Sequence, residues 1–564
     1  MSDRSTLAPH RPELVTDGVP SARPRWLELA MSTDHKDVGR LFIGAALSFL
    51  ALGMVGFLLM RLQLGVPEND LIEPVTFNRL LSVSSATLIV LFALPVAIGL
   101  YTYVVPLQIG ARGLAFPRLA SLSLWLYLAG GAILYASFAY TPPEAGFANW
   151  PPLSDSAFIS NNGIDVWATA IGLTVLGLVL QAINLAVTVS RLRAPGLAWR
   201  RLPPFSFSAA VSSWVLLVAG SAMFAGLVMF EIDRHFNGVF FDAGEGGAPV
   251  YYQHLSWLFF TGCYLLFLLP AFGAISEIIP AFAGKPLVSR ASVAASMAAL
   301  AGFGLLAWMQ NMFTASIPVG WLYMAMAAAL LAAVPVFVVF VNWMATLAGG
   351  AVRMRAPMLF ALGSISLLSF GLAGELVQGV IPVNWLLADT AAATAVTGYV
   401  FAGGPVLGGL AALHYWFPKI TGRTMGESMA KLSLALIIAG AHLTFIPLFL
   451  AGLEGQPVDV YKYFDVDNLG LYNLLATIGA FVLALGIVVS LVNVYRSVAH
   501  GARAGHDPWR GETLEWLTLS PPPPHNFDVV PDVRSDEPLR DIREAVTRRE
   551  PSAPETAEKT EPVA

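Results

Sequence analysis

The sequence contains many long apolar stretches, and these restrict the possible folds more than any other feature. A helix that crosses the hydrocarbon core of a bilayer needs about 20 consecutive, mostly apolar residues. About twelve stretches meet this requirement, at residues 39–62, 79–105, 118–140, 164–190, 207–232, 252–283, 287–310, 319–346, 355–380, 385–417, 428–453 and 469–497. The sequence therefore predicts an all-α, polytopic membrane protein with about twelve transmembrane helices.

Composition supports this class and excludes others. Of the 564 residues, 56% are hydrophobic and 12% are charged, which is more apolar surface than a soluble domain can bury. The stretches are too long for barrel strands and do not alternate. The net charge is −5 and there is no basic tract, so we expect the lipid bilayer, and not nucleic acid, as a partner. The single cysteine, Cys263, provides neither a disulfide framework nor a cysteine-rich metal site.

The charges between the stretches predict the orientation of the chain. Basic residues occupy every second connection, and the intervening loops are mostly acidic or neutral. The positive-inside rule then places both termini in the cytoplasm, as in a multi-pass protein of a prokaryotic plasma membrane. The basic connections contain Arg112, Arg118, Arg191, Arg193, Arg200, Arg201, Lys285, Arg290, Arg353, Arg355, Lys419 and Arg423.

The chain divides into four predicted segments. Residues 1–30 are polar and lack the apolar core of a cleavable signal peptide, which indicates a cytoplasmic N-terminal segment. Residues 31–499 form the twelve-helix membrane domain. Residues 500–534 include a run of prolines and are expected to form an extended cytoplasmic tail that packs on this domain. Residues 535–564 are rich in charge, Pro, Ala and Thr, and we expect them to be disordered.

Several motifs match those of one family in both order and spacing. Among them are STDHKDVGRLFI at 32–43, YQHLSWLFFTGCYLLFLLP at 252–270, HYWFPKITGR at 414–423 and SPPPPHNF at 520–527. Over about residues 31–531 the chain resembles subunit I of the haem–copper (cytochrome c) oxidases, respiratory enzymes that reduce oxygen to water. The resemblance implies a subunit I-like bundle and, as partners, other oxidase-like membrane subunits.

The metal ligands of that family are not found in this sequence. Members hold two haems and one copper ion through six histidines, because imidazole suits both iron and copper. The aligned positions carry other residues, namely Ser84, Val396 and Gly398 for the haem ligands and Thr261, Gln310 and Asn311 for the copper ligands. We therefore predict no catalytic residue and no bound haem or copper.

Other functional positions of the family differ as well. The position of the cross-linked tyrosine aligns with Leu265. The glutamate, aspartate and lysine of the proton paths align with Cys263, Gly113 and Val339. The arginine pair at the haem propionates aligns with Val458 and Asp459. The sequence differs from the family at the metal-ligand, proton-path and propionate positions together, and not at one ligand alone, which indicates a different role.

The remaining histidines do not form an obvious replacement site. Of the nine histidines, only His254, His414 and His442 lie within or beside predicted helices, and no two share a helix at a spacing of three or four residues. We interpret them as interfacial or hydrogen-bonded side chains. The alternative is a haem held by Met309 or Cys263, although neither has a visible partner ligand.

The space that two haems occupy in the family must be filled or closed here, because packed interiors tolerate large voids poorly. We expect Phe260, Tyr264 and Trp308 to enter this space as helices move inward. We also expect polar side chains at the altered positions to hydrogen-bond across helices, in a set comprising Ser84, Ser85, Thr261, Gln310, Asn311 and Thr397.

Acidic residues within the membrane domain are the positive candidates for function. Ionisable groups inside a bilayer are costly and therefore often functional. Glu375 and Asp389 are candidate functional acids near the outer ends of two helices, where a cation or a partner would bind. Glu277 replaces a family histidine near the inner end of another helix. The alternative for all three is an ordinary acid at a helix end.

Three functions remain open from the sequence. The first is a catalytically degenerate subunit I-like protein with a structural or assembly role in a respiratory, cytochrome c oxidase-like complex. The second is an active terminal oxidase with unusual ligation, which would require haem and copper. The third is a transporter or channel on the same bundle, with polar residues at the altered ligand positions lining a path.

Overall fold

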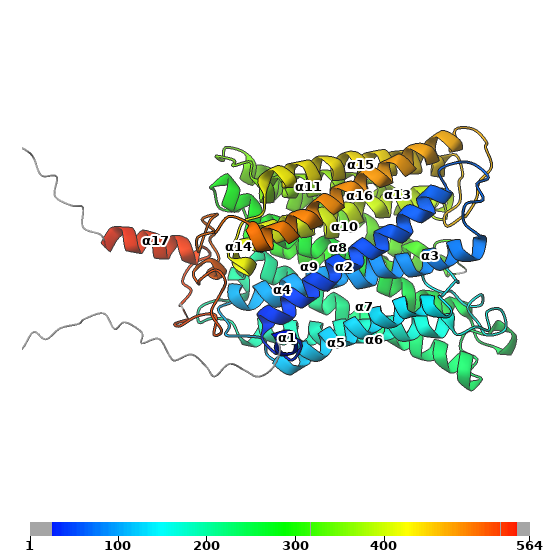
Figure 1. Cartoon of the computed structure of the whole chain (residues 1–564), viewed down its shortest axis with the longest axis horizontal. Helices are drawn as coiled ribbons and strands as arrows, with labels where there is room; N and C mark the ends of the chain where they lie inside the picture. Colours follow the sequence, from blue (N-terminus) through cyan, green and yellow to red (C-terminus); the bar gives the residue numbers. More distant parts are fainter. Residues whose placement is uncertain (1–24, 316, 531, 550–564) are drawn as a thin grey trace, which may run out of the picture.

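The computed structural model describes residues 25–549, apart from 316 and 531, and these are mostly helical (Figure 1). Among them, twelve spans are long and apolar enough to cross a membrane. The spans lie side by side in one elongated bundle (Figure 1). The predicted all-α, polytopic fold is therefore confirmed.

Single helices form eight of the spans. They are α2 (His35–Gln63), α6 (Gly163–Arg191), α7 (Pro204–Phe236), α8 (Pro249–Ala283), α10 (Val319–Leu347), α11 (Ala356–Gln378), α15 (Glu427–Leu453) and α16 (Leu469–His500).

The remaining four spans each include a π-helical or 3₁₀ segment. They are α3 (Pro74–Ala86), η1 (Thr87–Ala93) and α4 (Leu94–Gln108); α5 (Pro117–Ala136) and η2 (Ser137–Ala139); α9 (Arg290–Leu306) and η5 (Ala307–Met312); and α13 (Ala391–Phe401), η6 (Ala402–Gly408) and α14 (Gly409–Thr421).

The tenth span begins later than its apolar stretch predicts. The stretch starts at residue 385, but this residue lies in a short helix, α12 (Ile381–Leu387), and α13 begins only at Ala391. Thr390 caps α13, because its hydroxyl accepts a hydrogen bond from the Ala392 N–H at 3.3 Å. Hydropathy does not report such a helix start, since capping is local backbone chemistry.

The spans differ in how much of their surface other helices cover. In the most apolar part of Pro74–Gln108, 89% is buried inside the protein, and in α8 the fraction is 78%. In α10 it is only 22%. The α3–α4 span and α8 therefore lie in the core of the bundle, whereas α10 exposes most of its side chains to lipid or to a partner.

Glycines bring α15 and α16 into close contact. A Cβ added to Gly440 would lie 2.3 Å from the Leu483 nitrogen, and one added to Gly479 would lie 2.4 Å from the Thr444 nitrogen. Only residues without a side chain allow two backbones to approach so closely, which strengthens helix packing where no hydrophobic effect is available.

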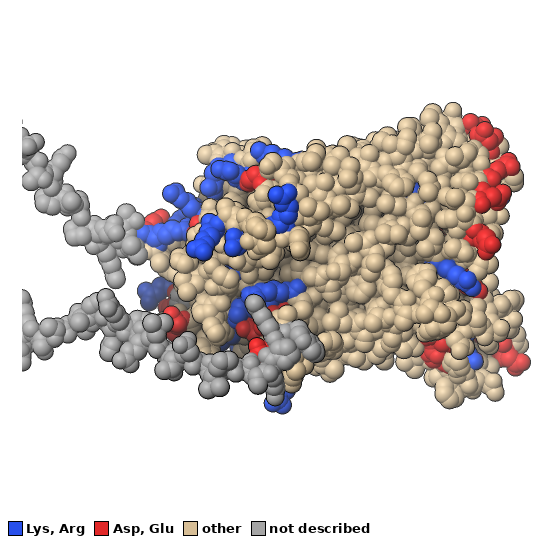
Figure 2. All heavy atoms as spheres, viewed as in Figure 1, with Lys and Arg blue, Asp and Glu red and all other residues tan. Residues whose placement is uncertain are grey.

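Charge is distributed unevenly along the bundle. We call the end at which α2 begins and α16 ends the tail end, because the chain from residue 501 also lies there (Figure 1). Lys and Arg gather mostly at the tail end, and the opposite end carries mostly Asp and Glu (Figure 2). The distribution matches the alternation of basic and acidic loops in the sequence.

The C-terminal part contains a helix that the sequence does not predict. Disorder is expected from residue 535, but Pro538–Arg549 form α17. Arg540 pairs with Glu512 at 2.9 Å, and Leu539 is buried. Ion pairs and one apolar contact thus give this charged segment a surface on which to fold. Residues 1–24 and 550–564, which belong to the predicted terminal segments, lie outside the described residues.

Candidate functional site

The haem-ligand positions of the resemblance lie where helices pack closely. A Cβ added to Gly56 of α2 would lie 1.9 Å from the Ser84 hydroxyl oxygen, so Ser84 of α3 rests against the α2 backbone. A Cβ added to Gly398 of α13 would lie 2.3 Å from the ring of Phe445 on α15. A Cβ added to Gly374 of α11 would lie 2.5 Å from a methyl group of Val396. Neighbouring helices therefore occupy the space beside all three positions.

No hydrogen bond joins the copper-ligand positions to one another in the described part of the chain. Thr261 of α8 has a buried hydroxyl without a hydrogen-bond partner. Gln310 of η5 donates a hydrogen bond to the Glu375 carboxylate of α11 at 3.2 Å, and Asn311 is exposed. The predicted network across helices is therefore wrong in extent. Gln310 alone makes such a bond, and Thr397 faces outward.

Glu375 is surrounded by polar groups inside the membrane span. Besides the bond from Gln310, the carboxylate interacts with Tyr264, whose hydroxyl makes no hydrogen bond of regular geometry. Nδ1 of His254, nearer the start of α8, is also buried without a partner. These groups can accept or donate hydrogen bonds to a small polar molecule or water.

Asp389, the second candidate acid, does not join Glu375. Its side chain is exposed, and it lies in the short connection between α12 and α13. The backbone oxygen of Asp389 accepts a hydrogen bond from the Val458 N–H at 3.0 Å, which ties this connection to the loop after α15. The two acids therefore do not form a shared outer site.

The three aromatic side chains that were expected to share one space point to different neighbours. Phe260 packs against Phe147 at a ring distance of 5.3 Å, and Trp308 packs against His254 at 5.0 Å. Tyr264 faces Glu375 instead. These contacts do not bring the three rings together, and their filling of the haem space stays a prediction.

Two of the three histidines within or beside the spans make a hydrogen bond through Nδ1, whereas Nδ1 of His254 makes none. In α14, His414 Nδ1 bonds the Leu410 carbonyl oxygen at 2.8 Å. In α15, His442 Nδ1 lies 2.8 Å from the Tyr399 hydroxyl. Both contacts agree with the prediction that these histidines are hydrogen-bonded. In neither contact does the ring bond another imidazole.

Only one group in the described part of the chain brings three metal-capable side chains together. Asp165 of α6 lies 3.0 Å from His235 of α7, which lies 3.4 Å from Glu231. Arg234 forms an ion pair with Asp165 at 2.6 Å, and its positive charge competes with any cation. Sequence analysis missed this cluster because its members come from two separate spans.

The non-α backbone segments occur beside the altered ligand positions. The π-helical segment η1 begins shortly after Ser84, and η6 begins shortly after Gly398. The 3₁₀ segment η5 contains both Gln310 and Asn311. Such segments often mark functional sites. In this chain they lie beside positions whose side chains are not imidazoles.

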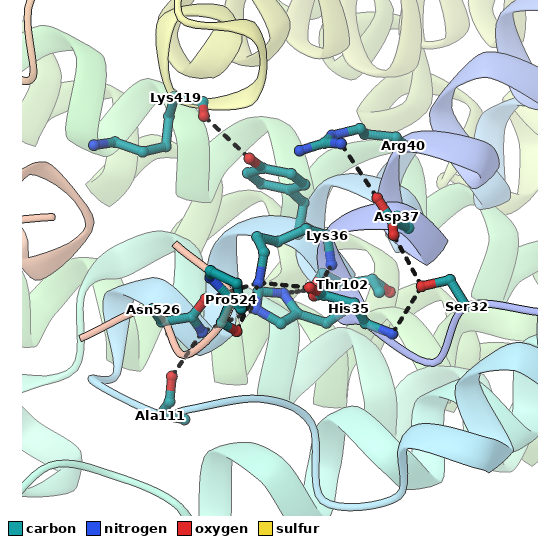
Figure 3. A network of polar contacts seen from close by, with 12 residues as sticks. Ser32, His35, Lys36, Asp37, Arg40, Thr102, Ala111, Lys419, Pro524 and Asn526 are labelled. Atoms are coloured by element: carbon teal, nitrogen blue, oxygen red, sulfur yellow. Dashed lines mark hydrogen bonds and ion pairs between the residues drawn. The ribbon is translucent and has the colours of Figure 1, made fainter. Parts of the chain in front are cut away.

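The densest polar contacts near the start of α2 join it to the tail (Figure 3). His35 bonds the Thr102 carbonyl oxygen at 3.1 Å and the Asn526 side chain at 2.9 Å. Lys36 donates to Asn526 at 3.2 Å and forms an ion pair with Asp34. Burial opposes the charge of Asp34, yet hydrogen bonds from Lys36 lower the pKa of that carboxyl. These residues join the first span to the tail. In the sequence, only the order of the motifs indicated this contact.

The bundle of twelve spans, with the tail docked at one end, defines a class, that of polytopic α-helical membrane proteins. A family model described as cytochrome c and quinol oxidase polypeptide I matches residues 37–482. The chain belongs to this family, the haem–copper oxidase subunit I family.

Individual relatives support this membership. Cytochrome c oxidase subunit 1 of Thermostichus vulcanus is 36% identical, with 90% of this chain and 92% of that protein covered. The Bacillus subtilis protein of the same name is 35% identical, with 90% and 82% covered. A heme–copper oxidase subunit I+III of Aeropyrum pernix is 35% identical, with 91% and 62% covered. A solved heme–copper terminal oxidase dimer shares the fold, with a TM-score of 0.68, 15% identity and 90% of each chain covered.

Proposed function

We propose that this chain is a catalytically degenerate member of its family, which binds neither haem nor copper and serves as a structural or assembly component of a cytochrome c oxidase-like complex. The observation that carries the proposal is the set of side chains at the six ligand positions. They offer two hydroxyl groups, two amides, an alkyl group and a hydrogen, but no imidazole. A low-spin haem needs two axial ligands from facing helices.

Helix packing supports the same proposal. Ser84 rests against Gly56, and the Phe445 ring rests against Gly398. A haem inserted between these helices would have to separate α3 from α2 and α13 from α15. The residues therefore do not fit the family's cofactors, and no reaction step is assigned to them.

A role in assembly is supported by the surface that remains available. Much of α10 is exposed, including Trp321, Tyr323 and Phe337. The family usually works with other oxidase subunits, and the Aeropyrum pernix relative is named as subunit I fused to subunit III. We propose that other oxidase-like membrane subunits bind such lateral surfaces.

Cofactor analysis of the purified full-length protein tests the central proposal. The pyridine-haemochrome spectrum and the copper content should both be near background, whereas the Bacillus subtilis relative, prepared identically, provides the positive control. Haem and copper in amounts comparable to protein would establish the alternative, an active terminal oxidase, which is the function that the relatives' names favour.

Partners are tested separately with an affinity-tagged chain in native membranes. A second oxidase-like subunit should co-purify in a constant ratio, and this ratio should persist after extraction in a mild detergent. Recovery of the chain alone would count against an assembly role. A transporter would instead show ion flux in liposomes that depends on Glu375 and Gln310, the polar pair inside the bilayer.

A further inference from the structure

Two buried carboxyl groups share one amide group at the tail end of the bundle. The side-chain amide of Gln108, at the end of α4, donates to Glu277 of α8 at 2.7 Å and to Glu515 at 3.1 Å. Glu515 belongs to the tail, in the short segment η7 (Leu514–Trp516), and is fully buried. Ser206 donates to the Gln108 oxygen at 2.7 Å, which orients the amide nitrogen toward both acids.

The two carboxyl groups differ in how their oxygens are satisfied. In Glu277 both oxygens accept N–H bonds, one from Gln108 and the other from the Phe205 backbone at 2.9 Å. In Glu515 one oxygen accepts from both Gln108 and the Trp416 indole at 3.1 Å, while Oε2 is buried and accepts no hydrogen bond of regular geometry, although the Thr513 side chain also interacts with this carboxyl. When an ionised carboxylate is buried, each of its oxygens needs to accept a hydrogen bond. The surroundings of Glu277 therefore suit the charged form, and those of Glu515 suit the neutral acid.

No positive group in the surroundings bonds to either acid. Lys419 donates its ammonium protons to backbone oxygens of the tail, including Thr518 at 2.8 Å. Arg290 approaches Glu277 electrostatically but lies 4.0 Å from Glu512. The other titratable neighbours, Tyr415 and Asp507, add no positive charge. Two negative charges here would therefore repel each other in a medium of low dielectric constant.

We propose that Glu277 and Glu515 form a buried proton-binding pair, with the proton on Glu515 Oε2, and that this proton fastens the tail to α8. The ligand is a single proton taken from water. Its release leaves two carboxylates around Gln108 and weakens the contact between the tail and the membrane domain. The pair lies outside the altered ligand positions, so this inference is independent of whether the chain holds haem.

The pH dependence follows from linkage. Burial raises the pKa of Glu515 above its ordinary value of 4.5. The docked tail then binds the proton more tightly than the released tail does. Docking is strongest at pH values below the ordinary pKa and weakens as the pH rises through the raised pKa. Between the ordinary and the raised pKa the released fraction grows by up to roughly tenfold per pH unit, and above the raised pKa it stays constant because Glu515 is then ionised in both states.

Infrared spectroscopy of the full-length protein tests where the proton resides. Near neutral pH, the wild-type spectrum should contain the C=O stretch of a protonated carboxylic acid that disappears in the Glu515→Gln variant and persists in Glu277→Gln. The matched control is Glu537→Gln, because Glu537 is also in the tail region but pairs with Arg540 at 2.6 Å. A wild-type minus Glu515→Gln difference spectrum that lacks this band would overturn the proposal.

Hydrogen exchange of tail amides tests the fastening. Relative to Glu515→Gln at the same pH, the wild-type tail should exchange equally at low pH and faster as the pH rises. The Glu277→Gln variant should lose stability, because its new NH₂ group would face an N–H donor. Equal exchange in wild type and Glu515→Gln at every pH would overturn the proposal.

Discussion

Gly398 illustrates how a single residue closes the space beside an altered ligand position. The ring of Phe445 lies where a Cβ would stand, and the ring itself is held between α13 and α15 by contact with Tyr399 at 5.1 Å. There is therefore no void beside Gly398, because an aromatic side chain from the adjacent helix packs against the glycine.

The Gly398→Ala substitution tests this packing. We expect a loss of about 1–3 kcal/mol, because the new methyl group would overlap the Phe445 ring in a well-packed region. Thermal unfolding in detergent, followed by loss of monodisperse protein, measures the change. Gly409→Ala in the same span is the control, since its Cβ would meet no atom within 4 Å. Equal unfolding temperatures for both variants would show that the ring does not hold its place.

At the scale of elements, the tail is as much a part of the bundle as the spans are. Asn526 contacts His35 and Lys36 of α2 and donates to the Ala111 carbonyl oxygen at 2.9 Å (Figure 3). One buried amide thus joins the tail, the first span and the loop after α4. Buried polar groups that satisfy one another in this way are costly to separate.

Replacing Asn526 with alanine should release the tail locally. His35 and Lys36 would each lose a partner while remaining buried, at a cost of about 1–3 kcal/mol. Limited proteolysis should then cleave residues 501–530 faster than in the wild type. The adjacent exposed residue provides the control, and His525→Ala should leave the cleavage rate unchanged. Unchanged cleavage in Asn526→Ala would mean that other contacts hold the tail.

At the scale of the whole molecule, charge separates the two ends of the bundle (Figure 2). The tail end carries Lys285, Arg353 and Arg423, and the opposite end carries acids such as Asp465 and Asp467. Each basic residue favours retention on the cytoplasmic side, so the pattern acts on the orientation of every span at once.

Reporter fusions test this orientation. A fluorescent protein fused after the C-terminus should fluoresce in bacterial cells, and alkaline phosphatase fused there should be inactive. Insertion of the phosphatase in the loop after α15, at residues 455–466, should give the opposite result. Phosphatase activity at the C-terminus would reverse the proposed orientation, with the tail end outside the cell.

The extent to which the sequence predicted the site varied with the type of interaction. The spans followed from hydropathy, and the loss of the ligand histidines, which rests on motif alignment, stays a prediction. The absence of a bond between Glu375 and Asp389, and the separate directions of Phe260 and Trp308, did not follow. Such directions depend on how helices rotate against each other, which one sequence does not state.

By itself, the sequence determined the all-helical class, the number of spans and the family, because bilayer thickness and motif order act on each segment separately. The tertiary structure alone decided that Ser84 and Gly398 face neighbouring helices, and that Glu277 meets Glu515. These contacts join residues that are far apart in the chain, and their energies depend on helix packing and desolvation. Neither quantity exists until the bundle has formed.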